Sequence, residues 1–484
     1  MAMPLSSKER FALGQQRRKD LRRADHAICN TKERREDSLK LLEASMRGRV
    51  PALVSLKYER MAASPFGYFR GAVPVMAYDL SLTRNTGLLT QLCGDAHVRN
   101  LGAFAGPDGR LVFDINDFDE TVVGPFEWDV KRMATSLVLA GREAGAKNMQ
   151  LTDAASVFLE RYRTTMNTFA RMPVLDVARH QVHRLRSVSP VEGILQLAER
   201  ATPMHTLLSL TEVEGGEVKA TGKKTVTKTA KSAAKAEKPK TAERPRRVFK
   251  TMPPVLTRVT GAMAEKVVAS LVPYTESLLR ERRHFLSQYR PVDVAFKVVG
   301  TGSVGLRDYC IYMEGNGARD PLFLQVKEEA QSGYAPYLGH VGGRSNRRGS
   351  YHQGRRVVEG ERAMQLQSDP FLGWTTMEGR DYLVRQLNDH KASIQLEELR
   401  TAGLMEYAGI CGELLARGHA RAGDCSMLAG YLGNSTRFDE AVVTFAMAYA
   451  DQTEKDWREL VQSMRKTGKT VAKKATKKRT LRRS

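Results

Sequence analysis

The sequence predicts an α+β protein of two lobes, a small lobe built on an antiparallel sheet and a larger helical lobe. Strand-like segments separated by glycines occupy residues 292–327, as in a sheet with short turns. Apolar residues with helical spacing flank this region on both sides, so helices should form most of the rest. With 484 residues, 42% of them hydrophobic, the chain is long enough to bury both cores.

Residues 1–215 should form a helical-lobe part that carries the polar motifs. Met133 and Leu137 fall on one face of a helix and mark its buried side. We expect an amphipathic helix at 37–47, a strand at 111–113, a helix at 126–141, and a helix at 154–171 behind an N-cap at Thr152 or Asp153.

Two basic segments supply most of the net charge of +23. Residues 217–247 hold 11 Lys and Arg against 3 Glu, and residues 465–484 hold 10 Lys and Arg and no acid. Neither segment has an apolar period, so we expect a disordered insertion at 216–247 and a disordered tail at 465–484. The segments either solubilise the protein or contact nucleic-acid phosphates without sequence preference.

The second part of the chain should contain the sheet lobe, residues 248–395, and the remainder of the helical lobe, residues 396–464. Glycines separate the first two strands, and Gly315-Asn316-Gly317 marks a turn before the third. The expected elements are a helix at 262–283, strands at 292–299, 306–313 and 321–327, a helix at 355–367, a strand at 380–387, and helices at 396–422 and 439–464.

A carboxylate cluster at a strand end is the first candidate site. Carboxylate oxygens combined with the carboxamide of Asn100 suit Mg²⁺ or Mn²⁺ better than zinc. A solvated acidic turn is the alternative, but apolar strand residues and Phe118 bracket the acids. The cluster comprises Gly94-Asp95-Ala96-His97-Val98-Arg99-Asn100 and, after the strand at 111–113, Asp114, Asp117 and Asp119.

A glycine-rich loop between two expected strands is the second candidate site. It reads Gly300-Thr301-Gly302-Ser303-Val304-Gly305. Glycines let the backbone approach phosphate oxygens and donate N–H groups to them. The strand–loop–strand context differs from the strand–loop–helix of dinucleotide folds. The third strand ends in Lys327, which either contacts phosphates or is an ordinary exposed lysine.

These motifs resemble those of the aminoglycoside and choline phosphotransferases, which have a protein-kinase-like fold. Their catalytic loop reads His-Gly-Asp, four residues, Asn, and this chain has Cys93-Gly94-Asp95 and Asn100 at the matching spacing. The resemblance implies that Asp95 is the catalytic base and that Asn100 and Asp117 bind Mg²⁺, with Asp114 and Asp119 as rival ligands. It also implies that Asp129 is a structural acid at the start of the next helix.

The kinase resemblance extends to the glycine loop. Lys327 would hold nucleotide phosphates, and Glu359 is our first choice for the helix glutamate that pairs with this lysine. A solvated helix acid is the alternative for Glu359. His97 either hydrogen-bonds Asp95 or a backbone carbonyl, or it binds the metal or positions the acceptor.

The order of the motifs is reversed relative to ordinary kinases, in which the glycine loop precedes the catalytic loop. We therefore expect a circularly permuted kinase-like fold, which requires exposed and neighbouring termini. Residues 411–419 (CGELLARGH) resemble the helix that precedes the catalytic loop in phosphotransferases. The hypothesis fails if Lys327 and Asp117 lie beyond the reach of one nucleotide.

Long motifs along the chain carry a closer resemblance. They are Arg60-Met61-Ala62-Ala63-Ser64-Pro65-Phe66, Tyr68-Phe69-Arg70-Gly71, Leu92-Cys93-Gly94-Asp95-Ala96-His97, 113–120, 124–132, 324–328, 354–360, Arg385-Gln386-Leu387 and Tyr449-Ala450-Asp451-Gln452. They resemble the bacterial family called domain of unknown function 2252, a resemblance that implies no established activity. Arg70 is either a buried structural arginine or a phosphate contact. Asn100-Leu101-Gly102 departs mildly from the family's Asn-Phe-Gly.

We expect a kinase-like phosphotransferase that uses ATP and Mg²⁺ on an unidentified hydroxyl-bearing acceptor. One alternative is a nucleotide- or nucleic-acid-binding protein without turnover. Another is a metal-dependent phosphoesterase, whose first metal motif resembles Gly94-Asp95-Ala96-His97 but whose later motifs are not found. No apolar run is long enough to span a bilayer, so we expect no membrane partner. Scattered cysteines and a polar N-terminus predict a cytoplasmic protein.

Overall fold

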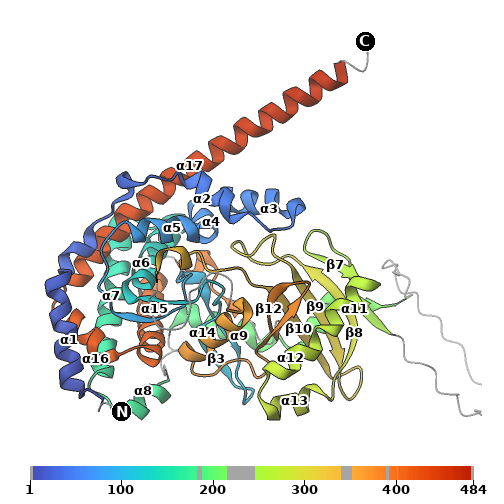
Figure 1. Ribbon diagram of the computed structural model, residues 1–484, viewed down its shortest axis with the longest axis horizontal. Helices are drawn as coiled ribbons and strands as arrows, with labels where there is room; N and C mark the ends of the chain where they lie inside the picture. Colours follow the sequence, from blue (N-terminus) through green and yellow to red (C-terminus); the bar gives the residue numbers. More distant parts are fainter. Residues whose placement is uncertain are drawn as a thin grey trace, which may run out of the picture.

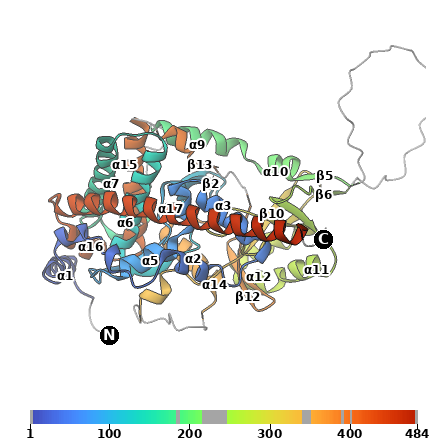
Figure 2. The ribbon, with the colours of Figure 1, turned by 90° about the horizontal axis from the view of Figure 1, so that it is seen from above.

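The structure is a computed structural model that describes residues 4–181, 188–214, 246–339, 351–387, 392–399 and 402–480. It is an α+β protein with antiparallel sheets. Most of the helices gather on one side, the helical side, and a six-stranded sheet lies on the other, the sheet side (Figure 1). The long helix α17 runs along the helical side and extends past it (Figures 1 and 2).

The six-stranded sheet is antiparallel throughout, in the order β11-β12-β10-β9-β8-β7. Every residue of the central strand β10 is buried, so the sheet is covered on both faces. The register places Lys327 of β10 opposite Asp308 of β9 and Leu383 of β12. The strands are β7 (Leu256–Val259), β8 (Arg290–Lys297), β9 (Asp308–Glu314), β10 (Pro321–Glu328), β11 (Gly373–Met377) and β12 (Arg380–Gln386).

Each face of this sheet has its own core, because alternate residues of a strand point to opposite faces. Ile311 and Leu324 pack in one core with Tyr274. Tyr312 and Phe323 belong to the other core, where their stacked rings lie 5.2 Å apart. Helices that contact the sheet include α10 (Pro203–Leu210), α11 (Ala262–Ala269) and α12 (Leu271–Ser277), and α13 (Arg280–Leu286) follows α12.

On the helical side, α6 packs against α7 and α17, and α15 packs along α7. α6 is buried from its first residue, Phe126, to Gly141, although it carries four charged side chains near its start. Buried charges require partners, so this helix marks a region with a special electrostatic arrangement. The helices are α6 (Phe126–Glu143), α7 (Asn148–Phe169), α15 (Ala402–Ala422), α16 (Cys425–Leu432) and α17 (Arg437–Thr480).

Short strands present the two polar loops. The loop between β1 and β2 carries Asp95, and the loop between β3 and β4 carries Asp117. β1 (Leu89–Leu92) pairs with β4 (Val122–Pro125), and β2 (Leu101–Ala105) pairs with both β3 (Leu111–Ile115) and β13 (Ala392–Ser393). The remaining elements include α1 (Ser7–Asp20), α2 (Ser38–Ser45), α3 (Pro51–Ala62), α4 (Pro65–Gly71), α5 (Val73–Ser81), α8 (Val174–Arg179), α9 (Ser189–Arg200), α14 (Gln353–Met364), β5 (Thr211–Val213) and β6 (Arg247–Phe249).

The four expected strands after residue 290 are present within two residues at each end. The helix expected at 262–283 is instead three short helices, α11 to α13. Pro273 lacks the N–H that a continuous helix needs, and it lies at the start of α12. The helix expected at 154–171 begins earlier, at Asn148, so Thr152 and Asp153 lie inside it and do not cap it.

The two basic segments have different outcomes. α17 continues to Thr480, through most of the tail expected to be disordered, in keeping with the high helix propensity of alanine, lysine and arginine. The insertion expected at 216–247 lies outside the described residues up to residue 245. Within the described part of the chain, every helix is too short or too polar to cross a membrane.

A buried ion network attaches the N-terminal segment to α5 and α17. Arg34 donates to Asp79 at 2.6 Å and to Asp456 at 2.8 Å, and Tyr449 Oη also donates to Asp79 at 2.6 Å. We expect Arg34→Ala to lower the free energy of unfolding by about 3–5 kcal/mol, because it leaves two buried carboxylates without their positive counter-ion. Urea denaturation measures this loss. Arg22→Ala removes the exposed pair with Asp25 and should change little; equal losses in the two variants would contradict the assignment.

Candidate functional site

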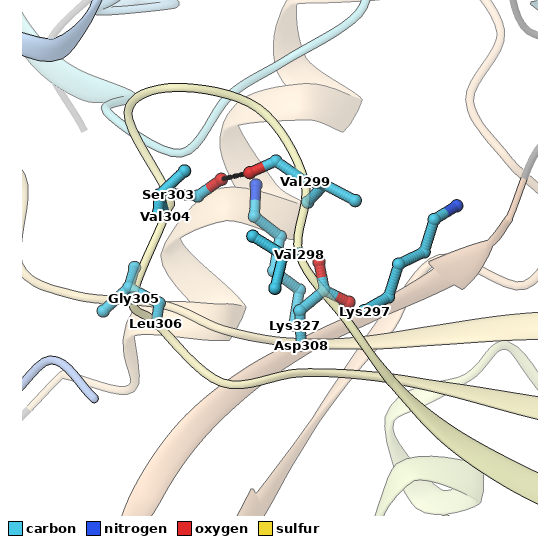
Figure 3. Close-up of a pocket in the computed structure, with 9 residues that line it drawn as sticks. All are labelled: Lys297, Val298, Val299, Ser303, Val304, Gly305, Leu306, Asp308 and Lys327. Atoms are coloured by element: carbon cyan, nitrogen blue, oxygen red, sulfur yellow. Dashed lines mark hydrogen bonds between the residues drawn. The ribbon is translucent and has the colours of Figure 1, made fainter. Parts of the chain in front are cut away.

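A cavity of about 440 Å³, the main cavity, opens where the sheet side meets the helical side. Its lining comes from both parts of the chain and includes most of the site residues that the sequence predicts. They are Asp95, His97, Asn100, Asp117, Asp119, Gly300, Gly302 and Ser303. Gly305 and Lys327 line a smaller cavity, together with Ser303, between the glycine loop and the sheet (Figure 3).

The turn that carries Asp95 is fixed by Asp129, at the start of α6. The Asp129 carboxylate accepts hydrogen bonds from the backbone N–H groups of Cys93, at 2.8 Å, and of Gly94, at 3.0 Å. Gly94 has φ +82°, and a Cβ there would lie 2.1 Å from the carbonyl oxygen of Glu120. Only glycine therefore lets the Asp95 loop approach the Asp117 loop this closely.

Asp95 is held by a fully buried arginine. Arg132 of α6 donates through Nε to Asp95 Oδ1 at 2.8 Å, and His97 Nε2 lies 3.4 Å from Asp95 Oδ2. Burial would raise the pKa of Asp95, but the positive charge of Arg132 holds it well below its usual value. Burial also lowers the pKa of His97. Asp95 is therefore an ionised carboxylate with one oxygen engaged and the other near His97.

Asn100 joins the two loops and leaves an oxygen available. Its Nδ2 donates to the carbonyl oxygens of Asp95, at 2.9 Å, and of Asp117, at 2.8 Å. Its Oδ1 is buried without a hydrogen-bond partner among the described residues. Together with the Asp117 carboxylate, whose side chain is 51% exposed, this oxygen is a donor of the kind that Mg²⁺ prefers.

No group of three or more His, Cys, Asp or Glu side chains in the described part of the chain could hold a metal ion by itself. Mg²⁺ is commonly bound through one or two carboxylates together with substrate phosphates, and it keeps several waters. The donors Asn100 Oδ1 and Asp117 fit a shared site of this kind and do not fit an all-protein cage.

The ammonium group of Lys327 lies among three carboxylates. Its Nζ pairs with Asp119, and it lies 3.8 Å from Asp117 Oδ1 and 4.0 Å from Glu329 Oε1. Figure 3 shows the side chain rising from the sheet towards the glycine loop. Burial would lower the pKa of Lys327, but Asp117 and Asp119 raise it above its usual value. This lysine therefore stays charged.

The carboxylates around Lys327 differ from one another. Burial and the negative charge of Asp117 raise the pKa of Asp119 to about 6. The protein atoms around the half-exposed Asp117 carboxylate would raise its pKa by desolvation, but Lys327 and Arg385 hold it below its usual value. Burial and the charge of Asp119 raise the pKa of Glu329 well above normal. At neutral pH, Asp117 is thus the carboxylate that is most strongly held in its ionised form.

Two other residues that the sequence proposed for the site, Glu359 and Asp114, lie outside it. Glu359 forms an ion pair with Arg355 at 2.8 Å on the exposed face of α14. Lys327 pairs instead with Asp117, Asp119 and Glu329. Asp114 is buried and pairs with Arg417 of α15. Of the three rival aspartates, Asp117 and Asp119 line the main cavity.

Several residues of the site were given no role by the sequence analysis, although Arg60, Arg132 and Arg385 lie within the motifs of the family resemblance. Isolated basic residues on helices usually face water, so only their burial reveals a role. A charged residue within an apolar strand, such as Arg385, was a further signal that could have found some of them. Side chains from near α3 donate to carbonyl oxygens of the glycine loop: Arg60 to Gly300, Lys57 to Gly302 at 2.5 Å, and Arg49 to Val304 at 2.6 Å.

Residues 49–463 match a family described as an uncharacterized protein conserved in bacteria, DUF2252. The match spans well over half of the 484 residues, so the chain belongs to this family. Comparison with curated proteins gave no match, and neither did comparison with solved structures. The family description names no activity, so the function has to be argued from the site.

Gly94→Ala tests the contact between the two loops. We expect Gly94→Ala to lower the free energy of unfolding more than the control variant Gly109→Ala does, by about 2 kcal/mol or more. Both positions have positive φ, but only Gly94 lacks space for a Cβ. Gly109 (φ +76°) has no heavy atom within 4 Å of the added carbon. Urea denaturation of both variants measures the difference, and equal losses would contradict the close approach.

Asp308, which lies opposite Lys327 in the sheet, gives a pH-dependent prediction. Burial raises its folded-state pKa to about 6, above the value of about 3.9 for an unfolded chain. Between these values the folded protein retains a proton that the unfolded chain has released, so stability should fall as pH rises. Across this pH range, we expect the free energy of unfolding of the wild type to fall by up to about 3 kcal/mol relative to that of Asp308→Asn. Urea denaturation from about pH 4 to 7 measures it; a pH-independent difference would contradict it.

Proposed function

We propose that this member of the DUF2252 family is a kinase-like phosphotransferase that transfers the γ-phosphoryl group of Mg-ATP to a hydroxyl group. The observation that carries the proposal is the 3.8 Å distance between Lys327 Nζ and Asp117 Oδ1. A phosphate-binding lysine and a metal-binding aspartate must both reach the phosphates of one nucleotide. The short distance between these two residues is compatible with that requirement, although the basic insertion separates them in the sequence.

The proposal includes a circularly permuted kinase-like fold. In support of it, helix α15, from the C-terminal part of the chain, packs against the loop of Asp95. Tyr407 Oη donates to the carbonyl oxygen of Val98 at 2.8 Å, and Arg417 pairs with Asp114. In the ordinary kinase order, a helix in this position would precede the catalytic loop in the chain. Here α15 comes after both the Asp95 loop and the sheet in the chain.

In the proposed reaction, Asp95 orients the acceptor hydroxyl through Oδ2, since Arg132 occupies Oδ1. The hydroxyl oxygen forms a bond to the γ-phosphorus, and the bond from that phosphorus to the β–γ bridging oxygen breaks. The hydroxyl proton passes to Asp95 and then to solvent, and ADP leaves. Because its pKa is low, Asp95 contributes more by positioning the hydroxyl than by basicity.

The nucleotide phosphates would lie between the glycine loop and the aspartate loop. Lys327 would contact the phosphates, and Asn100 Oδ1 and Asp117 would hold Mg²⁺, which neutralises phosphate charge when bound. The side chains of Arg49 and Lys57 hold carbonyl oxygens of the glycine loop and so keep it in place. A fixed loop loses less conformational entropy when phosphates bind.

A second candidate is nucleotide binding without turnover. The ion pair of Asp95 with Arg132 favours it, because the carboxylate that should accept a proton is already charge-paired. The two candidates share the nucleotide site and differ only in whether the γ-phosphoryl group is transferred.

The test is unfolding with and without Mg-ATP for wild type, Lys327→Ala and Asp117→Asn. At a nucleotide concentration 100-fold above Kd, we expect the free energy of unfolding of the wild type to rise by about 2.7 kcal/mol, since ligand binding stabilises the folded state. Both variants should lose the Mg-dependent gain, because each removes a contact with the phosphates or the metal. Differential scanning fluorimetry measures the shifts, and each protein is compared with its own unliganded state.

Matched controls separate the site from general effects of charge. Lys266→Ala removes an exposed lysine that pairs with Glu378, and Asp108→Asn removes an exposed acid in the β2–β3 turn. Both should keep the full Mg-ATP shift. Shifts with no detectable ADP formed would favour the second candidate. The absence of any shift in wild type would contradict both.

A further inference from the structure

Of the four arginines that line the main cavity, two donate no hydrogen bond to an oxygen atom of the described residues. Arg70, in the last turn of α4, and Arg99, two residues after His97, both line it. Neither forms an ion pair within the described residues, and the Nε of Arg70 donates to His97 Nε2 at 3.3 Å. Both side chains line the same cavity, and burial and the positive charge of Arg99 lower the pKa of Arg70.

The other cations around the cavity already have partners. Lys327 is paired with carboxylates, as described above, and Arg132 is paired with Asp95. Arg385 donates to Gln325 Oε1 at 3.0 Å and to the carbonyl oxygen of Asn116 at 3.2 Å. Arg49 and Lys57 donate to the glycine loop. Arg70 and Arg99 are therefore the cations left for a ligand in this part of the cavity.

The nearby acids do not neutralise this pair. Asp95 and Asp117 act on Arg70 electrostatically, but within the described part of the chain neither forms an ion pair with Arg70 or Arg99, and Asp95 is already bound by Arg132. His97 is 95% buried beside Arg70, and its Nδ1 has no hydrogen-bond partner among the described residues. Two like charges held together in a cavity are unfavourable unless an anion lies against them.

We propose that Arg70 and Arg99 bind an anionic group, phosphate or carboxylate, of the acceptor whose hydroxyl Asp95 orients. The inference rests on the proposed phosphotransferase function and names the class of its substrate, a hydroxyl compound that is itself an anion. Guanidinium groups suit this role because they bind planar carboxylates and phosphates through two parallel hydrogen bonds. Arg70 and Arg99 line the main cavity together with Asp95, and the Arg70 side chain is directed to His97, whereas Lys327 lies between the glycine loop and the sheet.

Isothermal titration calorimetry tests the anion site on the full-length protein saturated with Mg²⁺ and a non-hydrolysable ATP analogue. Inorganic phosphate is the probe in one arm and acetate in the other, and the tighter ligand identifies the anion. We expect Arg99→Gln and Arg70→Gln each to weaken that Kd by about tenfold or more, because each removes one of two charges on the anion. The Kd of the nucleotide should stay within about twofold, because the proposal assigns its phosphates to Lys327 and the glycine loop and not to these two arginines.

Arg110→Gln is the control, since Arg110 is 88% exposed in the β2–β3 turn. It should leave both constants unchanged. If Arg70→Gln does not fold, Arg99→Gln decides the outcome. Absence of binding by either anion would overturn the inference, as would competition between the anion and the nucleotide. The protein could also bind the anion through Arg99 but bind no Mg-ATP. That result would contradict both the proposed function and the assignment of the anion to the acceptor, and it would leave only an anion site.

Discussion

The buried ammonium group of Lys327 is the charge around which the rest of the site is arranged. A buried cation is tolerated only when carboxylates compensate it, and removing one partner leaves a costly uncompensated charge. The sheet side supplies the lysine and the helical side supplies Asp117 and Asp119. This ion pair therefore fixes how closely the two sides approach, and with it the width of the main cavity.

The loops that present these aspartates are held from several directions. Asp129 fixes the turn before Asp95, and Asn100 ties that turn to the aspartate loop. Arg356 of α14 donates to the carbonyl oxygens of Asp119, at 2.8 Å, and of Ala330, at 2.9 Å. α14 thus fastens the aspartate loop to the segment that follows β10. A site built in this way is preorganised, so little ordering remains to be done when a ligand binds.

The sequence could predict β8, β9, β10 and β12, because short β-rich segments between glycines have few other interpretations, but it missed β11 and β13. It also predicted some of the residues that line the main cavity, since Asp95, Asn100 and Asp117 stand at informative spacings. It could not predict which groups neutralise them. Arg132 compensates Asp95 from a buried helix, and Glu359, the expected partner of Lys327, pairs instead with Arg355. Such pairings depend on how distant segments pack, which no local pattern encodes.

The central claim is that Lys327 and Asp117 face one Mg-nucleotide site. A crystal structure of the protein with Mn²⁺ and a non-hydrolysable ATP analogue tests it most directly, because manganese gives an anomalous signal. Mn²⁺ is expected beside Asn100 Oδ1 and the Asp117 carboxylate, with a phosphate oxygen against Lys327 Nζ. Nucleotide bound away from the glycine loop, or manganese bound away from Asp117, would contradict the account.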